Sequence, residues 1–123
     1  MPRTVAVIGA SSDRRKFGNK AVRAFHAHGD TVHPVNPHER LIEGLTVYPS
    51  VLAIPGPIDM ATMYVPPEIG VQILDELARK GVGEVWLNPG SESDALVARA
   101  RALGLNVIEA CSVVGIGDSP SRY

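Results

Sequence analysis

One stretch near the amino terminus limits most strongly what this chain can fold into. The apolar run Val5–Ile8 passes directly into Gly9, a pattern typical of a strand that is buried on both faces and ends in a turn. Small polar residues follow, then the cations Arg14, Arg15 and Lys16, and then a segment with helical periodicity. In a strand–turn–helix unit, the backbone N–H groups of the turn and the positive end of the helix point outward. Such an arrangement is suited to binding phosphate. The sequence therefore predicts a phosphate-bearing nucleotide at this turn, with the three cations adding mobile positive charge.

The spacing of the glycines matches neither common phosphate-binding template. In a Gly-x-Gly-x-x-Gly motif counted from Gly9, the second and third glycines would stand at Ser11 and Arg14, and the next glycine is Gly18. A P-loop would likewise need a glycine at Arg14. The loop is therefore long and basic, and the alternative interpretation is an ordinary strand-to-helix connection whose cations are only solvated.

Composition narrows the class of protein. The 123 residues correspond to one domain, and the net charge of −1 argues against general nucleic-acid binding. Aromatic residues make up 5% of the chain, which also disfavours stacking on single-stranded nucleic acid. The single cysteine, Cys111, excludes an internal disulfide and a zinc site built on thiolates. Pro2 and Arg3 lead directly into the first strand and no apolar run has membrane-spanning length, so we expect no signal peptide, no membrane contact and a cytoplasmic location.

Strand patterns alternate with helical patterns along the chain. This alternation predicts an α/β fold, a Rossmann-like doubly wound parallel sheet with five main strands, one short strand and helices on both faces, in a single domain over residues 1–123. Cys111–Tyr123 lacks periodicity and is expected to be an irregular tail, and residues 36–46 show no clean periodicity either. The expected strands are Thr4–Ile8, Thr31–Val35, Ile58–Val65, Glu84–Leu87 and Leu105–Ile108, with a short one at Val47–Tyr48. The expected helices cover about 18–28, 67–80 and 91–103, with a single turn at 50–54.

Turn residues bound these helices. Glycine suits the left-handed position after a helix, and proline suits its first turn. Gly29, Gly81 and Gly104 are the expected helix ends, and Pro67 is the expected first-turn proline. Ser91, followed by Asp94 three residues later, predicts a variant of the capping box.

The end of the second strand bears on the ligand. An NAD-binding domain usually carries an acid there, which accepts hydrogen bonds from the ribose hydroxyls. Here the residues are Val35, Asn36 and Pro37, with no carboxylate among them, although Glu39 lies close by. A missing acid also removes a negative charge that would repel a ribose phosphate. Coenzyme A and NADP, which carry phosphate on the ribose as well as a diphosphate, therefore fit better than NAD.

Short motifs in a characteristic order run along nearly the whole chain. They are Val7–Ser11 after the first strand, Pro34–Pro37 after the second, Gly44–Tyr48, Val65–Pro67, Val85–Gly90 and Ala102–Ile108 before Cys111. Together they resemble the stand-alone CoA-binding domain proteins, which are similar to the N-terminal CoA-binding domain of the succinyl-CoA synthetase alpha subunit. The resemblance implies a Rossmann-like fold that binds coenzyme A or an acyl-CoA, mostly with no established reaction.

The resemblance also implies roles for individual residues. The loop after the first strand would meet the diphosphate, Lys16 or an arginine beside it would pair with a phosphate, and residues after the second and third main strands would line the nucleotide. The third main strand should lie next to the first, at the switch point where open sheets bind ligands. The implied cofactor-binding residues are Gly9, Ala10, Ser11, Ser12, Arg14, Arg15, Lys16, Gly18, Asn36, Pro37, Val65 and Pro66.

No set of catalytic or metal-binding residues stands out. The four histidines lack metal-ligand spacing, and there is no Gly-x-Ser-x-Gly elbow. Cys111 is either a buried apolar residue or a thiol close enough to form a mixed disulfide with a CoA thiol. We therefore expect binding of coenzyme A without catalysis, with a protein partner or a homo-oligomer left open. The alternatives are an NADP-dependent oxidoreductase, or a fragment of one, and an interaction domain with a vestigial nucleotide site.

Overall fold

A parallel sheet of five strands forms the centre of the structure, a computed structural model that describes residues 2–123. Its strands are β1 (Thr4–Ile8), β2 (Thr31–Val35), β5 (Met60–Met63), β6 (Glu84–Leu87) and β7 (Val107–Glu109). They lie in the order β2-β1-β5-β6-β7, and each neighbouring pair is parallel. Parallel neighbours need crossover connections, which the intervening helices supply. The predicted Rossmann-like α/β fold with five main strands is confirmed.

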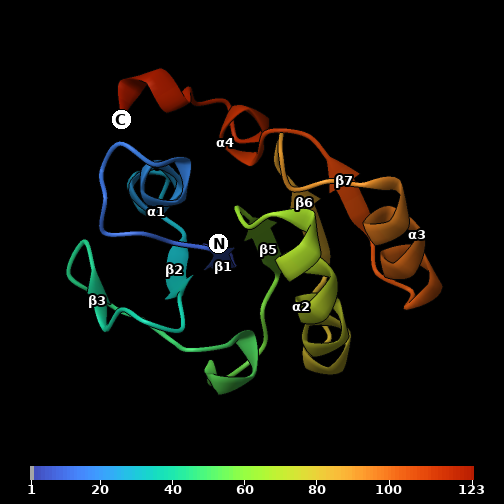
Figure 1. Cartoon of the computed structure of the whole chain (residues 1–123). Coiled ribbons are helices and arrows are strands. Elements are labelled where there is room, and N and C mark those ends of the chain that lie inside the picture. The colour runs from blue at the N-terminus through green and yellow to red at the C-terminus, as the bar shows by residue number, and fades with distance from the viewer. Residues whose placement is uncertain (1) are drawn as a thin grey trace.

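Helices cover both faces of the sheet (Figure 1). On one face lie α1 (Phe17–Ala27) and the single turn α4 (Ser112–Gly115), and on the other lie α2 (Pro67–Lys80) and α3 (Asp94–Ala102). The chain therefore leaves the neighbouring strands β1 and β5 on opposite faces, as predicted. Such a switch point opens a crevice at the carboxyl ends of the strands, where doubly wound sheets bind ligands. Within residues 2–123, no helix is both long and apolar enough to span a bilayer.

β1 is buried on both faces, as its unbroken apolar run predicts. Val5 and Val7 belong to the core that contains Phe25 of α1, whereas Ala6 and Ile8 belong to a second core under α2 and α3. None of these four β1 residues is more than 1% exposed. β1 is therefore a fixed support for the turn that follows it.

Glycine and proline bound the helices as predicted. Gly29, Gly81 and Gly104 follow α1, α2 and α3 with positive φ angles of 95°, 74° and 78°. Pro67 occupies the first turn of α2, where its missing N–H group costs no helical hydrogen bond.

The predicted start of α3 is wrong. Ser93, not Ser91, precedes the helix, and its side-chain oxygen accepts a hydrogen bond from the Leu96 N–H at 3.1 Å. Ser91 is buried, and its hydroxyl donates to the Met63 carbonyl at 3.1 Å. The capping pattern fails at Ser91 because the carboxyl end of β5 engages its hydroxyl.

Residues 36–46 contain a small hairpin that the sequence analysis misses. β3 (Leu41–Ile42) pairs antiparallel with β4 (Leu45–Thr46). The turn between them consists of Glu43 and Gly44, with φ angles of 50° and 76°. Strands of two residues are too short to show a period, and glutamate is not a residue that favours positive φ.

Other boundaries differ by a few residues. β5 is shorter than the predicted Ile58–Val65, and β7 starts two residues later than predicted. The expected short strand at Val47–Tyr48 is reduced to one parallel bridge between Tyr48 and Val35. The predicted one-turn helix at 50–54 is a 3-10 turn, η1 (Val51–Ala53). The tail is not wholly irregular, because it contains α4 and the 3-10 turn η2 (Pro120–Arg122).

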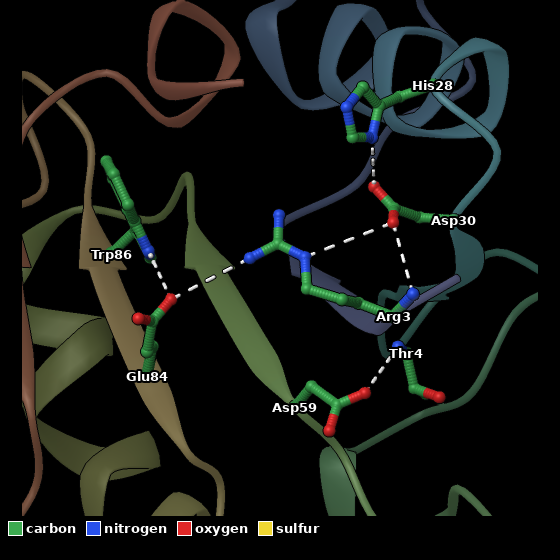
Figure 2. Close-up of polar contacts among 7 residues, drawn as sticks. All are labelled: Arg3, Thr4, His28, Asp30, Asp59, Glu84 and Trp86. Atoms are coloured by element: carbon green, nitrogen blue, oxygen red, sulfur yellow. Dashed lines mark hydrogen bonds and ion pairs between the residues drawn. The ribbon is translucent and has the colours of Figure 1, made fainter. Parts of the chain in front are cut away.

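Polar contacts hold the amino ends of the strands (Figure 2). The buried Asp30 carboxylate accepts a hydrogen bond from the Arg3 N–H at 3.2 Å and lies 3.0 Å from His28 Nδ1. Asp59 accepts a hydrogen bond from the Thr4 N–H at 2.8 Å. This end of the sheet is thus closed by internal contacts, and the crevice lies at the opposite end.

Candidate functional site

A cavity of about 620 Å³ opens at the carboxyl ends of the strands. Its walls come from the turn after β1, the start of α1 and the loops after β2, β5 and β6. Eight of the predicted site residues line it: Gly9, Ala10, Ser11, Lys16, Gly18, Asn36, Val65 and Pro66. The fold thus brings together residues that are up to 57 positions apart in the sequence, from Gly9 to Pro66.

The other four predicted residues lie beside this cavity. Arg14 forms an ion pair with Glu43 at 3.3 Å. The side chain of Arg15 donates two hydrogen bonds of 3.0 Å to the carboxylate of Asp13. The hydrogen bonds from Arg15 lower the pKa of Asp13 to about 2. Of the three basic side chains, only that of Lys16 lines the cavity.

Pro37 and Ser12 occupy neighbouring positions. Pro37 lines an adjoining apolar cleft of about 230 Å³, together with Val51 of η1 and Val65. The exposed Ser12 donates its N–H to Glu39 Oε2 at 3.1 Å. The role of both residues in binding stays a prediction.

Gly9 makes the turn after β1 possible. Its φ angle is 83°, and a Cβ atom there would lie 2.8 Å from both the Tyr64 carbonyl oxygen and Val65 Cγ1. The N–H groups of Gly9 and Ala10 both donate to the Val35 carbonyl, at 3.1 and 3.3 Å. The turn therefore packs between the ends of β2 and β5, and this packing leaves no room for a side chain at position 9.

Gly18 lets α1 begin directly against this turn. A Cβ atom at Gly18 would collide with the Gly9 carbonyl oxygen. In the dinucleotide fingerprint, the third glycine has the same task of close packing between helix and strand. Here the two glycines are nine residues apart, and the longer loop between them carries the charged residues.

Among the residues of this turn that line the cavity, three have a backbone N–H group with no acceptor within the described part of the chain. These residues are Ser11, Phe17 and Gly18. Phe17 and Gly18 are the first two residues of α1, whose initial N–H groups have no partner within the helix. Free N–H donors at the positive end of a helix form a site for an anionic group such as phosphate.

The hairpin tip holds the loop in place. Asn19, which is buried, donates from Nδ2 to the Ser11 carbonyl at 2.9 Å and to Glu43 Oε2 at 3.1 Å. Arg23 donates to Asn19 Oδ1 at 2.7 Å and to the Arg14 carbonyl at 2.9 Å. The hydrogen bond from Asn19 is the main cause of a lowered pKa at Glu43. Asn19 could have been noticed as a polar residue on the apolar face of α1, but nothing in the sequence points to Glu43.

A carboxylate also lies at the end of β2, contrary to the argument from sequence. The side chain of Asn36 accepts hydrogen bonds from the N–H groups of His38 and Glu39, at 2.7 and 3.2 Å. This turn reverses the chain, so that Glu39 returns to the cavity wall and accepts the Ser12 N–H. The absence of an acid at 35–37 therefore does not leave the wall without a negative charge.

A buried polar cluster forms the floor beneath the loops after β5 and β6. Asn88 Nδ2 donates to Thr62 Oγ1 at 2.7 Å, and Asn88 Oδ1 accepts the Ser112 N–H at 2.9 Å. The Tyr64 hydroxyl lies 3.2 Å from Ser112 Oγ, and burial is the main cause of its raised pKa. These contacts fix the positions of the loops but leave no unpartnered buried side-chain polar atom among the described residues.

Cys111 is partly buried next to this floor. It lines a small pocket of about 120 Å³ with Phe17, Tyr64, Asn88 and Pro89, three of which also line the main cavity. In the described part of the chain, no three His, Cys, Asp or Glu side chains are grouped so that they could hold a metal ion.

Fold and site together define the class as a Rossmann-like, doubly wound domain with a glycine turn at a switch-point cavity. The sequence profile of the CoA-binding domain family matches residues 3–121, and the chain belongs to this family. The predicted family resemblance is therefore confirmed.

The relatives include much longer enzymes. The alpha subunit of ADP-forming acetate–CoA ligase II from Pyrococcus furiosus is 36% identical over 118 residues, which cover 87% of this chain but 26% of that protein. A conserved hypothetical protein from Pyrococcus furiosus superposes with a TM-score of 0.85 and 33% identity, covering 92% of this chain and 98% of that one. The dinucleotide-forming acetyl-coenzyme A synthetase 1 of Candidatus Korarchaeum cryptofilum superposes with a TM-score of 0.78 and 30% identity, covering 89% and 26%. The chain thus spans about a quarter of the two named enzymes.

Proposed function

We propose that this chain binds coenzyme A or an acyl-CoA in the switch-point cavity, with the diphosphate at the start of α1. The observation that carries the proposal is the set of free N–H groups of Ser11, Phe17 and Gly18 on the wall of that cavity. They offer hydrogen bonds to phosphate oxygens where the helix end is positive, and Lys16 adds a cation on the same wall. Membership of the CoA-binding domain family supports this choice among phosphate-bearing ligands.

The layout of the cavity supports a direction for the ligand. We propose that the adenosine lies toward Asn36 and Pro66, beside the apolar cleft that contains Pro37 and Val65. A planar base gains from burial against apolar side chains, whereas the diphosphate needs donors. The pantetheine arm would then run past the loop after β6, where Pro89 and Ser91 line the same cavity.

We further propose that the chain binds its ligand without catalysing a reaction of its own. Among the hydrogen bonds of residues 2–123, none joins a serine hydroxyl or the cysteine thiol to a histidine ring, the pairing that activates a nucleophile. The activity named for the long relatives belongs to proteins of about four times this length. A reaction involving this chain would then depend on groups from outside residues 1–123.

Titration with four ligands tests the proposal. We expect coenzyme A and acetyl-CoA to raise the thermal unfolding midpoint and to bind in calorimetry, because a ligand that binds the folded state stabilises it. NAD and NADP at equal concentrations should have a smaller effect. A larger response to NADP than to coenzyme A would favour the oxidoreductase alternative, and no response to any nucleotide would favour the interaction domain with a vestigial site.

A further inference from the structure

Glu39 lines the proposed nucleotide cavity, and one of its two carboxylate oxygens has no hydrogen-bond donor within residues 2–123. The carboxylate of Glu39 accepts two hydrogen bonds within residues 2–123, and both reach the same atom, Oε2, from the Ser12 N–H at 3.1 Å and from Asn36 Nδ2 at 3.5 Å. No donor in that part of the chain reaches Oε1. A carboxylate has lone pairs on both oxygens, so Glu39 keeps one complete acceptor for a ligand.

The position of this carboxylate is fixed from two sides. The Asn36 side chain accepts the N–H groups of His38 and Glu39, and Asn36 Nδ2 donates to the Ala10 carbonyl at 2.8 Å. The Ser12 N–H then anchors the far end of the Glu39 side chain to the glycine loop. Glu39 therefore bridges the end of β2 and the loop after β1, the two segments between which a nucleotide ribose lies in doubly wound folds.

The charge of Glu39 determines what it can accept. An ionised carboxylate binds a hydroxyl as a hydrogen-bond donor but repels a phosphate, which offers no donor at neutral pH. Coenzyme A carries its ribose phosphate on the 3′ oxygen and leaves the 2′-hydroxyl free, whereas NADP carries a 2′-phosphate. We propose that Glu39 is a specificity-determining residue that accepts the ribose 2′-hydroxyl through Oε1 and excludes nucleotides phosphorylated at that position.

This inference rests on the proposed function, because it assumes that coenzyme A occupies the cavity. It also removes the reason that the sequence offers for disfavouring NAD, since the adenosine ribose of NAD has a free 2′-hydroxyl as well. The wall holds an acid after all, and the acid faces the 2′ position rather than the 3′-phosphate, since a carboxylate beside the 3′-phosphate would oppose binding of coenzyme A. A second acid, Glu92, accepts the N–H of Gly90, a residue of the cavity lining, at 3.2 Å and offers a matched control.

Two isomeric probes separate the 2′ and 3′ positions without a change of total charge. Adenosine 3′,5′-bisphosphate is the nucleotide end of coenzyme A, and adenosine 2′,5′-bisphosphate is its isomer with the phosphate moved. Each is used to displace coenzyme A from the wild-type protein, from Glu39→Gln and from Glu92→Gln. Glutamine keeps the volume of the side chain and a carbonyl for the Ser12 N–H, but it removes the charge. Circular dichroism and thermal melting confirm that each variant is folded.

The wild-type protein should prefer the 3′,5′ isomer by about tenfold or more, the equivalent of one charge-assisted hydrogen bond. Glu39→Gln should bring the ratio of the two dissociation constants close to one, and Glu92→Gln should leave that ratio unchanged. Equal binding of both isomers by the wild type, an unchanged ratio in Glu39→Gln, or failure of both isomers to displace bound coenzyme A would each overturn the inference while the proposed function stands. Failure of the wild-type protein to bind coenzyme A at all would overturn the proposed function and the inference together.

Discussion

At the scale of single residues, Gly9 and Gly18 decide how closely α1 approaches the end of β1. The carbonyl oxygen of Gly9 occupies the space that a Gly18 side chain would need, and Gly9 itself is pressed against the loop after β5. The same close approach brings Phe17 and Gly18, the first two residues of α1, into the cavity lining. The sequence shows both glycines, but the contact between them depends on the path of the eight residues that separate them.

Gly9→Ala should lower the free energy of unfolding by about 1–3 kcal/mol, since positive φ and overpacking each carry a cost of that order. Gly29→Ala is a matched control, because Gly29 has a φ of 95° and open space around its Cβ position. Urea denaturation should show a larger loss of unfolding free energy for Gly9→Ala than for Gly29→Ala. The difference is the cost of the close contact between the new methyl group and the Tyr64 carbonyl. Equal losses in the two variants would mean that the chain relaxes around the new methyl group.

Lys16 is the basic residue of the loop whose replacement should affect binding most. Lys16 lines the cavity, whereas the guanidinium of Arg15 is held by Asp13. We expect Lys16→Ala to weaken binding of coenzyme A by about tenfold, the low end for a charged hydrogen bond because this side chain is exposed. The loss should shrink at high salt, which screens exposed charges. Calorimetry on Arg15→Ala supplies the comparison, and an equal loss there would place a phosphate outside the cavity.

At the scale of elements, the sequence predicts long periodic segments well and short ones poorly. The five sheet strands and the three long helices follow from apolar periodicity, with Gly29, Gly81 and Gly104 as stops. The hairpin β3–β4 and the turn α4 are missed, because two to four residues cannot display a period. The same limit hides part of the site, since Glu43 at the hairpin tip and Glu39 reach the loop only through these irregular segments.

The hairpin tip should influence the loop although it lies outside the cavity lining. Glu43 contacts Asn19, which donates to the Ser11 carbonyl, and Arg14, which is itself a residue of the loop. Glu43→Ala should therefore speed amide hydrogen exchange of residues 11–16 and weaken coenzyme A binding by a few fold. Glu68→Ala, in the exposed first turn of α2, removes an acid without a contact to the loop. Unchanged exchange in Glu43→Ala would show that the contacts from Asn19, Arg23 and Glu39 hold the loop without Glu43.

At the scale of the whole molecule, the two ends of the sheet differ in structure. The amino ends of the strands are joined by internal contacts, whereas the carboxyl ends carry the glycine turn, the free N–H groups and the cavity. The groups proposed to bind the ligand therefore lie at the end of the sheet opposite to the contacts of Arg3, Asp30 and Asp59, and β1 connects the two ends. A domain built this way can also form one part of a much longer enzyme. The relatives with about four times the length of this chain contain such a similar part.

The dependence of stability on pH should reveal the contribution of His33. This residue lies on the edge strand β2, with its ring packed edge-on against Tyr48 at 5.4 Å between ring centres. Burial, with a smaller effect from the charge of Lys80, lowers the pKa of His33 below its usual value of about 6.5. The unfolded chain therefore binds a proton at His33 in a pH range where the folded protein does not. Stability from this residue is fully present above about pH 7 and is lost as the pH falls from there through the folded pKa.

Urea unfolding at pH 7.5 and at pH 5.5 measures this effect. The wild-type protein should unfold at a lower urea concentration at pH 5.5, and His33→Gln should reduce the difference between the two midpoints. His26→Gln is the control, because it replaces a histidine that is exposed on α1. The physical reason is that glutamine at position 33 has no proton to take up on unfolding, so the protonation difference between the two states disappears. If His33→Gln and the wild type lose the same stability between the two pH values, burial of this ring does not oppose its protonation, and the pH dependence arises elsewhere in the chain.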